Sequence, residues 1–191
     1  MTDTVQRLHR ILEPILALDD PRPRLSAYHD MPCAIFRYDL ADEFLLRKEL
    51  RLLGTRLARR GKRVHRVSLA ECLADALEAE APIARLAEAE RSIGLGSAID
   101  TVHAVLSEYA PLVDLVAARL PRDPDPTRDV VFVVRAGALF PVYRTFALLE
   151  QLKGRVLAPT VLFYPGVLDG PAGLRFMGVL EADHKYRPKI F

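Results

Sequence analysis

The feature that most constrains the fold of this chain is an unbroken apolar run at residues 130–134, VVFVV. A strand of this composition has no polar face to turn toward water, so it must be covered on both sides, as the inner strands of parallel sheets are. Residues 161–164, VLFY, have the same character. We therefore predict that these two segments are neighbouring interior strands of a sheet, to which residues 32–38 and 62–67 add further strands.

Between these strands, the apolar residues recur with the spacing of amphipathic helices. Residues 42–60 place Leu46, Leu50, Leu53 and Leu57 on one stripe, and Gly61 follows as a typical helix end. Further helices are predicted at 3–18, 69–80, 82–92, 97–119 and 140–152, and short strands at 174–179 and 185–191. Strands that alternate with helices predict an α/β fold, a three-layer sandwich with a mostly parallel central sheet of about five strands. We expect one domain over residues 1–191, with a lead-in helix at 1–20 and an α-rich insertion at 69–120.

The composition is that of a globular protein that folds without a disulfide or a metal ion. The chain has 27 Lys and Arg against 25 Asp and Glu, a formal net charge of +2, and half of its residues are apolar. A chain of this length can bury a core without a disulfide or a metal ion. Cys33 and Cys72 lie far apart with no CxxC partner, which favours a reducing compartment over a structural zinc site. With no signal-peptide pattern and no uncharged apolar run of about 18 residues, we expect a cytoplasmic protein that uses no cofactor.

The sequence patterns of common active sites are missing. The chain contains no GxxxxGK(S/T) phosphate loop, no GxSxG and no HExxH. Residues 94–96, GLG, begin like a dinucleotide-binding fingerprint, but they follow a predicted helix and lack the third small residue, so we interpret them as a helix break. The five histidines are scattered, and none can be paired with a nucleophile. We assign no catalytic residue and predict that the chain is not an enzyme.

The predicted topology nevertheless indicates a ligand pocket. The carboxyl ends of parallel strands meet at one edge of a sheet, where ligands usually bind. Gly137 opens the turn after residues 130–134, where free amides and an arginine could hold an anion or a nucleotide. The alternative is that Gly137 only makes a turn and Asp39 only caps a helix. The candidate pocket residues are Asp39, Arg135, Gly137, Arg144, Tyr164 and Gly166.

Charge is distributed unevenly along the chain. Residues 47–66 hold nine Lys or Arg against one acid, whereas residues 71–91 hold six acids against two arginines. The basic side chains spread around helix 42–60 outside its leucine stripe, with no aromatic residues between them for base stacking. Three interpretations stay open: a solvated face, a weak and salt-sensitive contact to nucleic acid, or a contact to an acidic protein.

Two segments are candidates for a protein interface. Leu45 and Leu52 lie about 120° from the leucine stripe, so helix 42–60 is expected to touch a second neighbour, such as another chain. The tail at 186–191 offers aromatic and arginine side chains of the kind that anchor interfaces. The alternative is that Phe191 folds back into the core and the basic helix only keeps the chain soluble. The candidate interface residues are Leu45, Leu52, Arg56, Arg59, Arg60, Arg63, Tyr186, Arg187 and Phe191.

The second half of the chain carries motifs that resemble a known family. These motifs are AGALFPVYR at 136–144, LLE at 148–150, VLFYPG at 161–166, Gly170, LRFMG at 174–178 and Tyr186-Arg187. Together they resemble the BrxB family, the small B component of bacteriophage exclusion (BREX) systems, whose members have about this length. The resemblance implies membership of an antiphage defence assembly that also contains a large ATPase, a DNA methyltransferase and a phosphatase-like PglZ protein.

Two functions of different class follow. The first is a non-enzymatic adaptor that bridges larger BREX proteins, with the PglZ-like protein or the large ATPase as the partners that the resemblance implies. The second is a small nucleotide- or nucleic-acid-binding domain, with phosphoester hydrolysis as its enzymatic form. We favour the adaptor, because the sequence contains no catalytic constellation and α/β folds host many functions. No membrane partner is expected.

Overall fold

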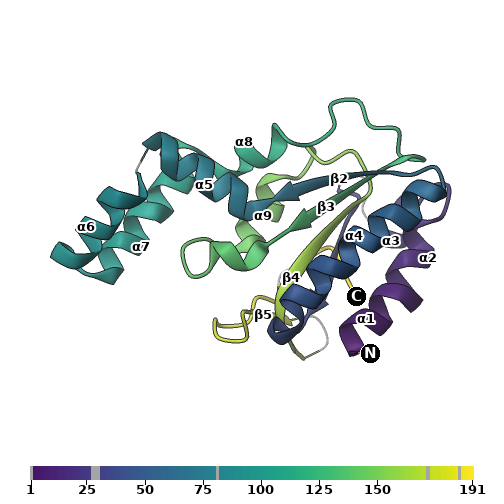
Figure 1. Cartoon of the computed structure of the whole chain (residues 1–191), viewed down its shortest axis with the longest axis horizontal. Helices are drawn as coiled ribbons and strands as arrows, with labels where there is room; N and C mark the ends of the chain where they lie inside the picture. Colours follow the sequence, from purple (N-terminus) through teal and green to yellow (C-terminus); the bar gives the residue numbers. More distant parts are fainter. Residues whose placement is uncertain (1, 27–30, 81, 171–172, 185) are drawn as a thin grey trace.

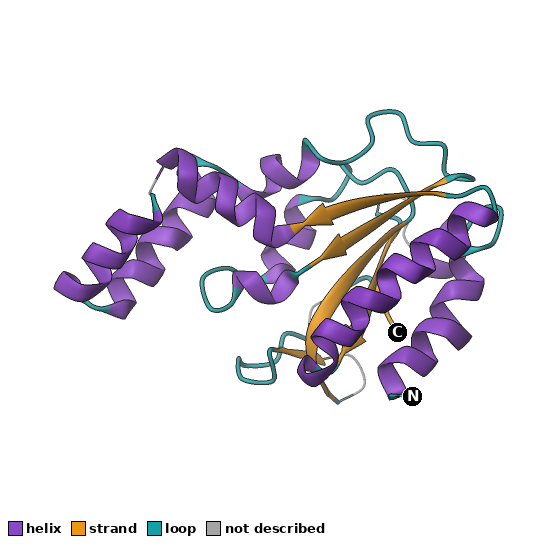
Figure 2. Ribbon diagram, in the orientation of Figure 1, coloured by secondary structure: helices purple, strands orange, loops and turns teal. Residues whose placement is uncertain are grey.

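The computed structural model describes residues 2–26, 31–80, 82–170, 173–184 and 186–191 of the chain. A six-stranded sheet forms the middle layer, and helices cover both of its faces (Figures 1 and 2). The strands are β1 Cys33–Tyr38, β2 Arg63–Ser68, β3 Asp129–Val134, β4 Thr160–Asp169, β5 Gly173–Phe176 and β6 Lys189–Ile190. The predicted three-layer α/β fold with a mostly parallel sheet is therefore confirmed.

The strand order is β2-β3-β4-β1-β6, and all neighbours along this path run parallel. β3 and β4 are interior neighbours, with Val131 opposite Thr160 and Val133 opposite Leu162, as the two apolar runs predict. β4 continues past the sheet edge and pairs antiparallel with β5. The predicted strand at 174–179 is this β5, which ends where the chain turns at Met177. The predicted strand at 185–191 is reduced to β6, and Lys185 lies outside the described residues.

One face of the sheet is covered by the N-terminal helical segment and the helix after β1. Leu46, Leu50, Leu53 and Leu57 are buried there together with the ring of Phe132, as their spacing predicts. The elements of this layer are α1 Asp3–Arg7, the π-helical turn η1 Leu8–Leu12, α2 Glu13–Leu16, α3 Arg22–Leu25, the 3-10 turn η2 Leu40–Asp42 and α4 Glu43–Arg59. Gly61 ends α4 with a φ of 81°, a backbone conformation that glycine adopts without strain.

The other face is covered by shorter helices. They are α5 Leu69–Glu80, η3 Val105–Tyr109, α8 Leu112–Ala117, η4 Ala136–Leu139 and α9 Thr145–Gln151. The helix predicted at 97–119 is interrupted before Pro111, whose ring and missing N–H disfavour a continuous helix. The helix predicted at 140–152 begins only at Thr145: Pro141 disfavours a helical conformation at Phe140, and the backbone is still extended at Arg144, just before α9. The predicted helices are thus present with shifted bounds, whereas the short helix α3 was not predicted and residues 140–144 are not helical.

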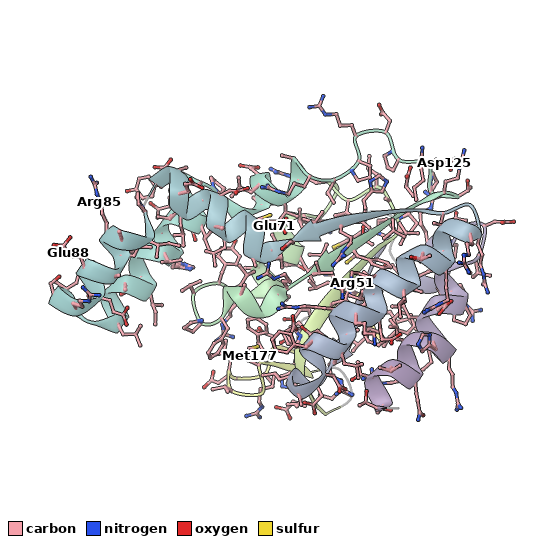
Figure 3. All side chains as sticks on the ribbon, viewed as in Figure 1. Arg51, Glu71, Arg85, Glu88, Asp125 and Met177 are labelled. Atoms are coloured by element: carbon pink, nitrogen blue, oxygen red, sulfur yellow. The ribbon has the colours of Figure 1, made fainter. Side chains whose placement is uncertain are left out.

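A helical hairpin extends beyond the sheet (Figure 1). It consists of α6 Ile83–Ile93 and α7 Leu95–Ala104, which contact each other and turn at Gly94. No described side chain of α6 is buried, and α7 buries only Ala98. Arg85 and Glu88 project from α6 away from the sheet (Figure 3). We call this hairpin the arm. No helix among the described residues is long and apolar enough to cross a membrane.

Candidate functional site

A hollow of about 300 Å³ lies where β3 and β4 reach the carboxyl edge of the sheet. Its walls come from three places in the chain: η2 with the start of α4, the turn after β3, and Pro165 of β4 with the turn after β5. Met177 sits at the β5 end of this region (Figure 3). The lining residues are Leu40, Glu43, Arg47, Arg135, Gly137, Ala138, Pro165 and Met177. We call this hollow the carboxyl-edge pocket.

Backbone strain is concentrated at this pocket. Arg135 leaves β3 in the left-handed region, with φ 60° and ψ 37°, and Met177 has a φ of 53°. These are the only two non-glycine residues with positive φ in the part of the chain that the structure describes. Each such residue costs about 1–3 kcal/mol, and such outliers cluster at functional sites. The Met177 turn is held by its amide, which donates to the carbonyl of Pro165 at 3.0 Å.

Arg135 also places a guanidinium at this pocket that has no carboxylate partner among the described residues. Its Nε is buried without a hydrogen-bond partner, and its guanidinium forms no ion pair with the described residues. The carboxylate in the same pocket, Glu43, is already engaged, because it accepts hydrogen bonds from the Tyr38 hydroxyl and from Arg47 Nε, the latter at 2.6 Å. Burial and the neighbouring Glu43 raise the pKa of Tyr38 above its usual value, so this phenol stays a donor. Arg135 is thus the cation of this pocket that is free to meet a ligand.

Of the residues predicted for a ligand pocket, the structure brings two, Arg135 and Gly137, into the lining of this hollow. A Cβ on Gly137 would lie 3.4 Å from the sulfur of Met177, an ordinary contact, so the glycine opens space without being required by sterics. Asp39 lies beside the pocket rather than in its wall, and its carboxylate accepts from the amide of Ala41 at 2.9 Å. This is the helix-capping role that the alternative interpretation gave it.

The other three predicted pocket residues do not line it. Gly166 is required by packing, because a Cβ there would lie 2.3 Å from the carbonyl oxygen of Arg175 on β5. The Tyr164 ring packs into the core of the opposite layer, and burial raises the pKa of its hydroxyl. Arg144 lies next to Asp183, with 3.5 Å between nitrogen and oxygen, outside the pocket.

Sequence reasoning missed the α4 and β5 sides of this pocket. Glu43 and Arg47 stand four residues apart just after β1, a spacing that indicates a helical ion pair. That signal was available in the sequence. The approach of Pro165 and Met177 to the turn at Gly137 was not, because it depends on β4 bending past the sheet edge to pair with β5.

The exposed side of α4 is the second candidate site. Leu45 and Leu52 are 37% and 45% exposed, and Lys48 and Arg59 lie on the same side of the helix by their spacing. We call these four residues the α4 stripe. Arg60 follows at the end of the helix and is also exposed. Within the described residues, neither Arg59 nor Arg60 forms an ion pair, so their charge is not neutralised by the chain itself.

Two predicted interface arginines are engaged inside the molecule. Arg56 donates to both oxygens of Glu13 at 2.8 and 2.9 Å. Burial alone would raise the pKa of Glu13, but hydrogen bonds from Arg56 and His9 lower it below its usual value. Arg63 donates to both oxygens of the buried Asp129 at 2.8 and 2.6 Å. These arginines hold helices and strands together, and less of their charge is available to a partner.

The side chains of the tail, residues 186–191, are largely packed against the chain's own core. Tyr186 is half-buried, meets Phe146 edge-on at 5.5 Å between ring centroids, and shares a hydrogen bond of 3.2 Å with the Thr145 hydroxyl. The Phe191 backbone donates to Ile35 at 2.8 Å, and its ring packs against the α4 layer. This placement agrees with the alternative in which Phe191 folds back. Arg187 remains exposed.

Fold and sites together define a class: an α/β protein with a mostly parallel sheet, a small and mainly apolar hollow that contains charged side chains at its carboxyl edge, and a partly apolar, basic helix face. Among the described residues, no group of three or more His, Cys, Asp or Glu is placed to hold a metal ion. The sequence matches the family described as "BREX protein BrxB" over residues 65–190, about two thirds of the chain, so the chain belongs to this family. The family named from the sequence motifs is therefore confirmed.

A curated relative gives the same result. The chain is 27% identical over 155 residues to the BREX protein BrxB of Bacillus cereus (strain H3081.97), which covers 80% of this chain and 79% of that protein. No solved structure matches the chain. Family membership supports a role in BREX defence.

Proposed function

We propose that this protein is a non-enzymatic adaptor of a BREX assembly that bridges larger components, with a PglZ-like protein and a large ATPase as its partners. Membership of the BrxB family supports the assembly to which it contributes. The sequence offers no phosphate loop, nucleophile elbow or zinc-binding helix that would support catalysis instead. The adaptor role requires a surface suited to a partner.

The observation that carries this proposal is the α4 stripe. Leu45 and Leu52 expose apolar surface in the middle of a helix, and Lys48 and Arg59 flank them with charge that no residue in the described ranges neutralises. Apolar centres with charged surroundings are typical of protein interfaces. The charges would speed association with an acidic partner, and Leu45 and Leu52, once covered by that partner, would set how long the complex lasts. The partner surface is therefore expected to be acidic around an apolar centre.

Co-purification tests the proposal directly. Each BREX component is expressed with this protein, and its retention is measured for the wild type and for the double reversal Arg59→Glu, Arg60→Glu. The matched control is Arg85→Glu, Arg91→Glu, which changes charge equally but lies on the arm. We expect the α4 reversal to lose at least one component and the arm reversal to keep it. If the wild type retains no component, the adaptor proposal is wrong.

The same samples distinguish the second function class. Nuclease treatment before purification removes partners that are held only through nucleic acid, and such binding should weaken steeply with salt, because it rests on phosphate contacts. We expect the wild-type complex to survive this treatment. The purified chain is also expected to turn over neither ATP nor phosphate esters with added Mg²⁺ or Mn²⁺. Turnover that disappears in Arg135→Gly would replace the adaptor with a phosphoester hydrolase.

A further inference from the structure

The carboxyl-edge pocket holds a positive charge that nothing in the described chain satisfies. Arg135 lines the pocket, its Nε is buried without a partner, and its backbone is kept in the left-handed region. Glycine or asparagine usually occupies that region, and an arginine there raises the free energy of the folded state more than glycine would. The second strained residue, Met177, closes the opposite wall. Strain on two walls of one pocket is the pattern of a preorganised binding site.

The pocket is small and mainly apolar around this charge. Its volume of about 300 Å³ lies at the lower end of ligand pockets. Leu40, Ala138, Pro165 and Met177 supply apolar walls. A hollow of this size suits one small molecule or the last residue of a peptide, and it is too small for a dinucleotide.

The charge balance of the lining selects among anions. Two arginines and one glutamate line the pocket, which leaves one net positive charge. A single carboxylate balances that charge, and its two oxygens match the fork of a guanidinium. A phosphate monoester carries close to two negative charges at neutral pH, so it would exceed the one net positive charge of the lining and be repelled by Glu43 more strongly than a carboxylate is. The lining therefore favours a carboxylate over a nucleotide.

We propose that the carboxyl-edge pocket binds a single carboxylate on a short apolar body, with Arg135 as the carboxylate-binding residue. A free carboxylic acid and the carboxyl terminus of a peptide offer the same chemistry. This inference does not rest on the adaptor function, since it is tested on the purified chain without any BREX component.

N-acetyl-leucine is the probe, and N-acetyl-leucinamide is its neutral counterpart. Binding to the full chain is followed by titration calorimetry and by chemical shifts of the amides near Gly137 and Met177. We expect the acid to bind at least about tenfold more tightly than the amide, and inorganic phosphate and AMP to bind more weakly than the acid. A short peptide that ends in a leucine carboxylate separates the two sources: tighter binding than N-acetyl-leucine indicates a peptide terminus, and equal binding indicates a free acid.

The decisive variant is Arg135→Gly, because glycine adopts the left-handed backbone without strain and the fold should be kept. It is expected to lose the preference for acid over amide while its thermal unfolding temperature stays equal or rises. Arg144→Gln is the matched control, since it removes an arginine outside the pocket. The proposal is overturned if the wild type binds acid and amide equally, if it binds neither, if AMP binds more tightly than the acid, or if Arg135→Gly retains wild-type affinity for the acid.

Discussion

At the scale of single residues, two glycines that the sequence placed at the same sheet edge have different surroundings. A Cβ on Gly166 would lie 2.3 Å from a backbone oxygen of β5, whereas one on Gly137 would first meet the flexible Met177 side chain at 3.4 Å. We expect Gly166→Ala to lower the free energy of unfolding by about 2–3 kcal/mol, because β5 must move. Gly137→Ala should change it by less than about 1 kcal/mol. Urea denaturation of both variants measures the difference, and equal losses would contradict the β4–β5 pairing.

Residue type alone could not reveal all of the pocket. Gly137 could be identified because a glycine after an apolar strand indicates a turn, and Arg135 because it ends that strand. The positive φ of Arg135 has no sequence signature, since left-handed backbone is expected at glycine and asparagine. Tyr164 was assigned to the pocket because it ends a strand, but side chains alternate between faces and this one points into the opposite core.

At the scale of elements, the tail acts as part of the sheet. β6 pairs with β1, and Tyr186 and Phe191 pack on the two different layers. Deletion of residues 186–191 is therefore expected to lower the free energy of unfolding by about 3 kcal/mol or more, as loss of buried aromatic rings does. Chemical denaturation followed by circular dichroism gives the value.

Arg187→Glu is the matched variant for this prediction, because Arg187 is exposed and its replacement should change stability by less than about 0.5 kcal/mol. A truncated chain as stable as the wild type would show that β6 contributes nothing to the fold. The stability of the truncated chain also decides how a lost partner is interpreted: a component lost on truncation but kept by Arg187→Glu indicates an interface only where the truncated chain stays folded.

The elements themselves were largely predictable, since each depends on a local pattern. The apolar runs predicted β3 and β4, and the leucine spacing predicted α4. The interruptions around Pro111 and Pro141 were less clear, because proline is tolerated in the first turn of a helix and excluded from its interior. The sequence alone does not show whether Pro111 and Pro141 lie in the first turn of a helix or interrupt one, because that depends on which residues pack against the core.

At the scale of the whole molecule, stability should be unequal between the sheet and the arm. α4 buries four leucines, whereas no described side chain of α6 is buried. We expect the backbone amides of α6 to exchange with solvent at least about 100-fold faster than those in the middle of α4, because local opening of α6 exposes little apolar surface. Hydrogen exchange followed by mass spectrometry measures this, with α5, which buries four side chains as α4 does, as a second protected reference. Equal protection of α6 and α4 would mean that the arm is held by contacts beyond those described.

The strand order also decides when the protein can fold during its synthesis. β1 is made first, but both of its neighbours, β4 and β6, lie in the last part of the chain. About 120 residues separate Tyr38 from Thr160, so at translation rates of roughly 5–20 residues per second the ribosome spends several seconds to half a minute before β1 can pair. For that time its apolar side chains have no sheet to join. A nascent chain stopped before β4 should therefore depend on chaperones to stay in solution, even though the finished protein buries five of the six residues of β1.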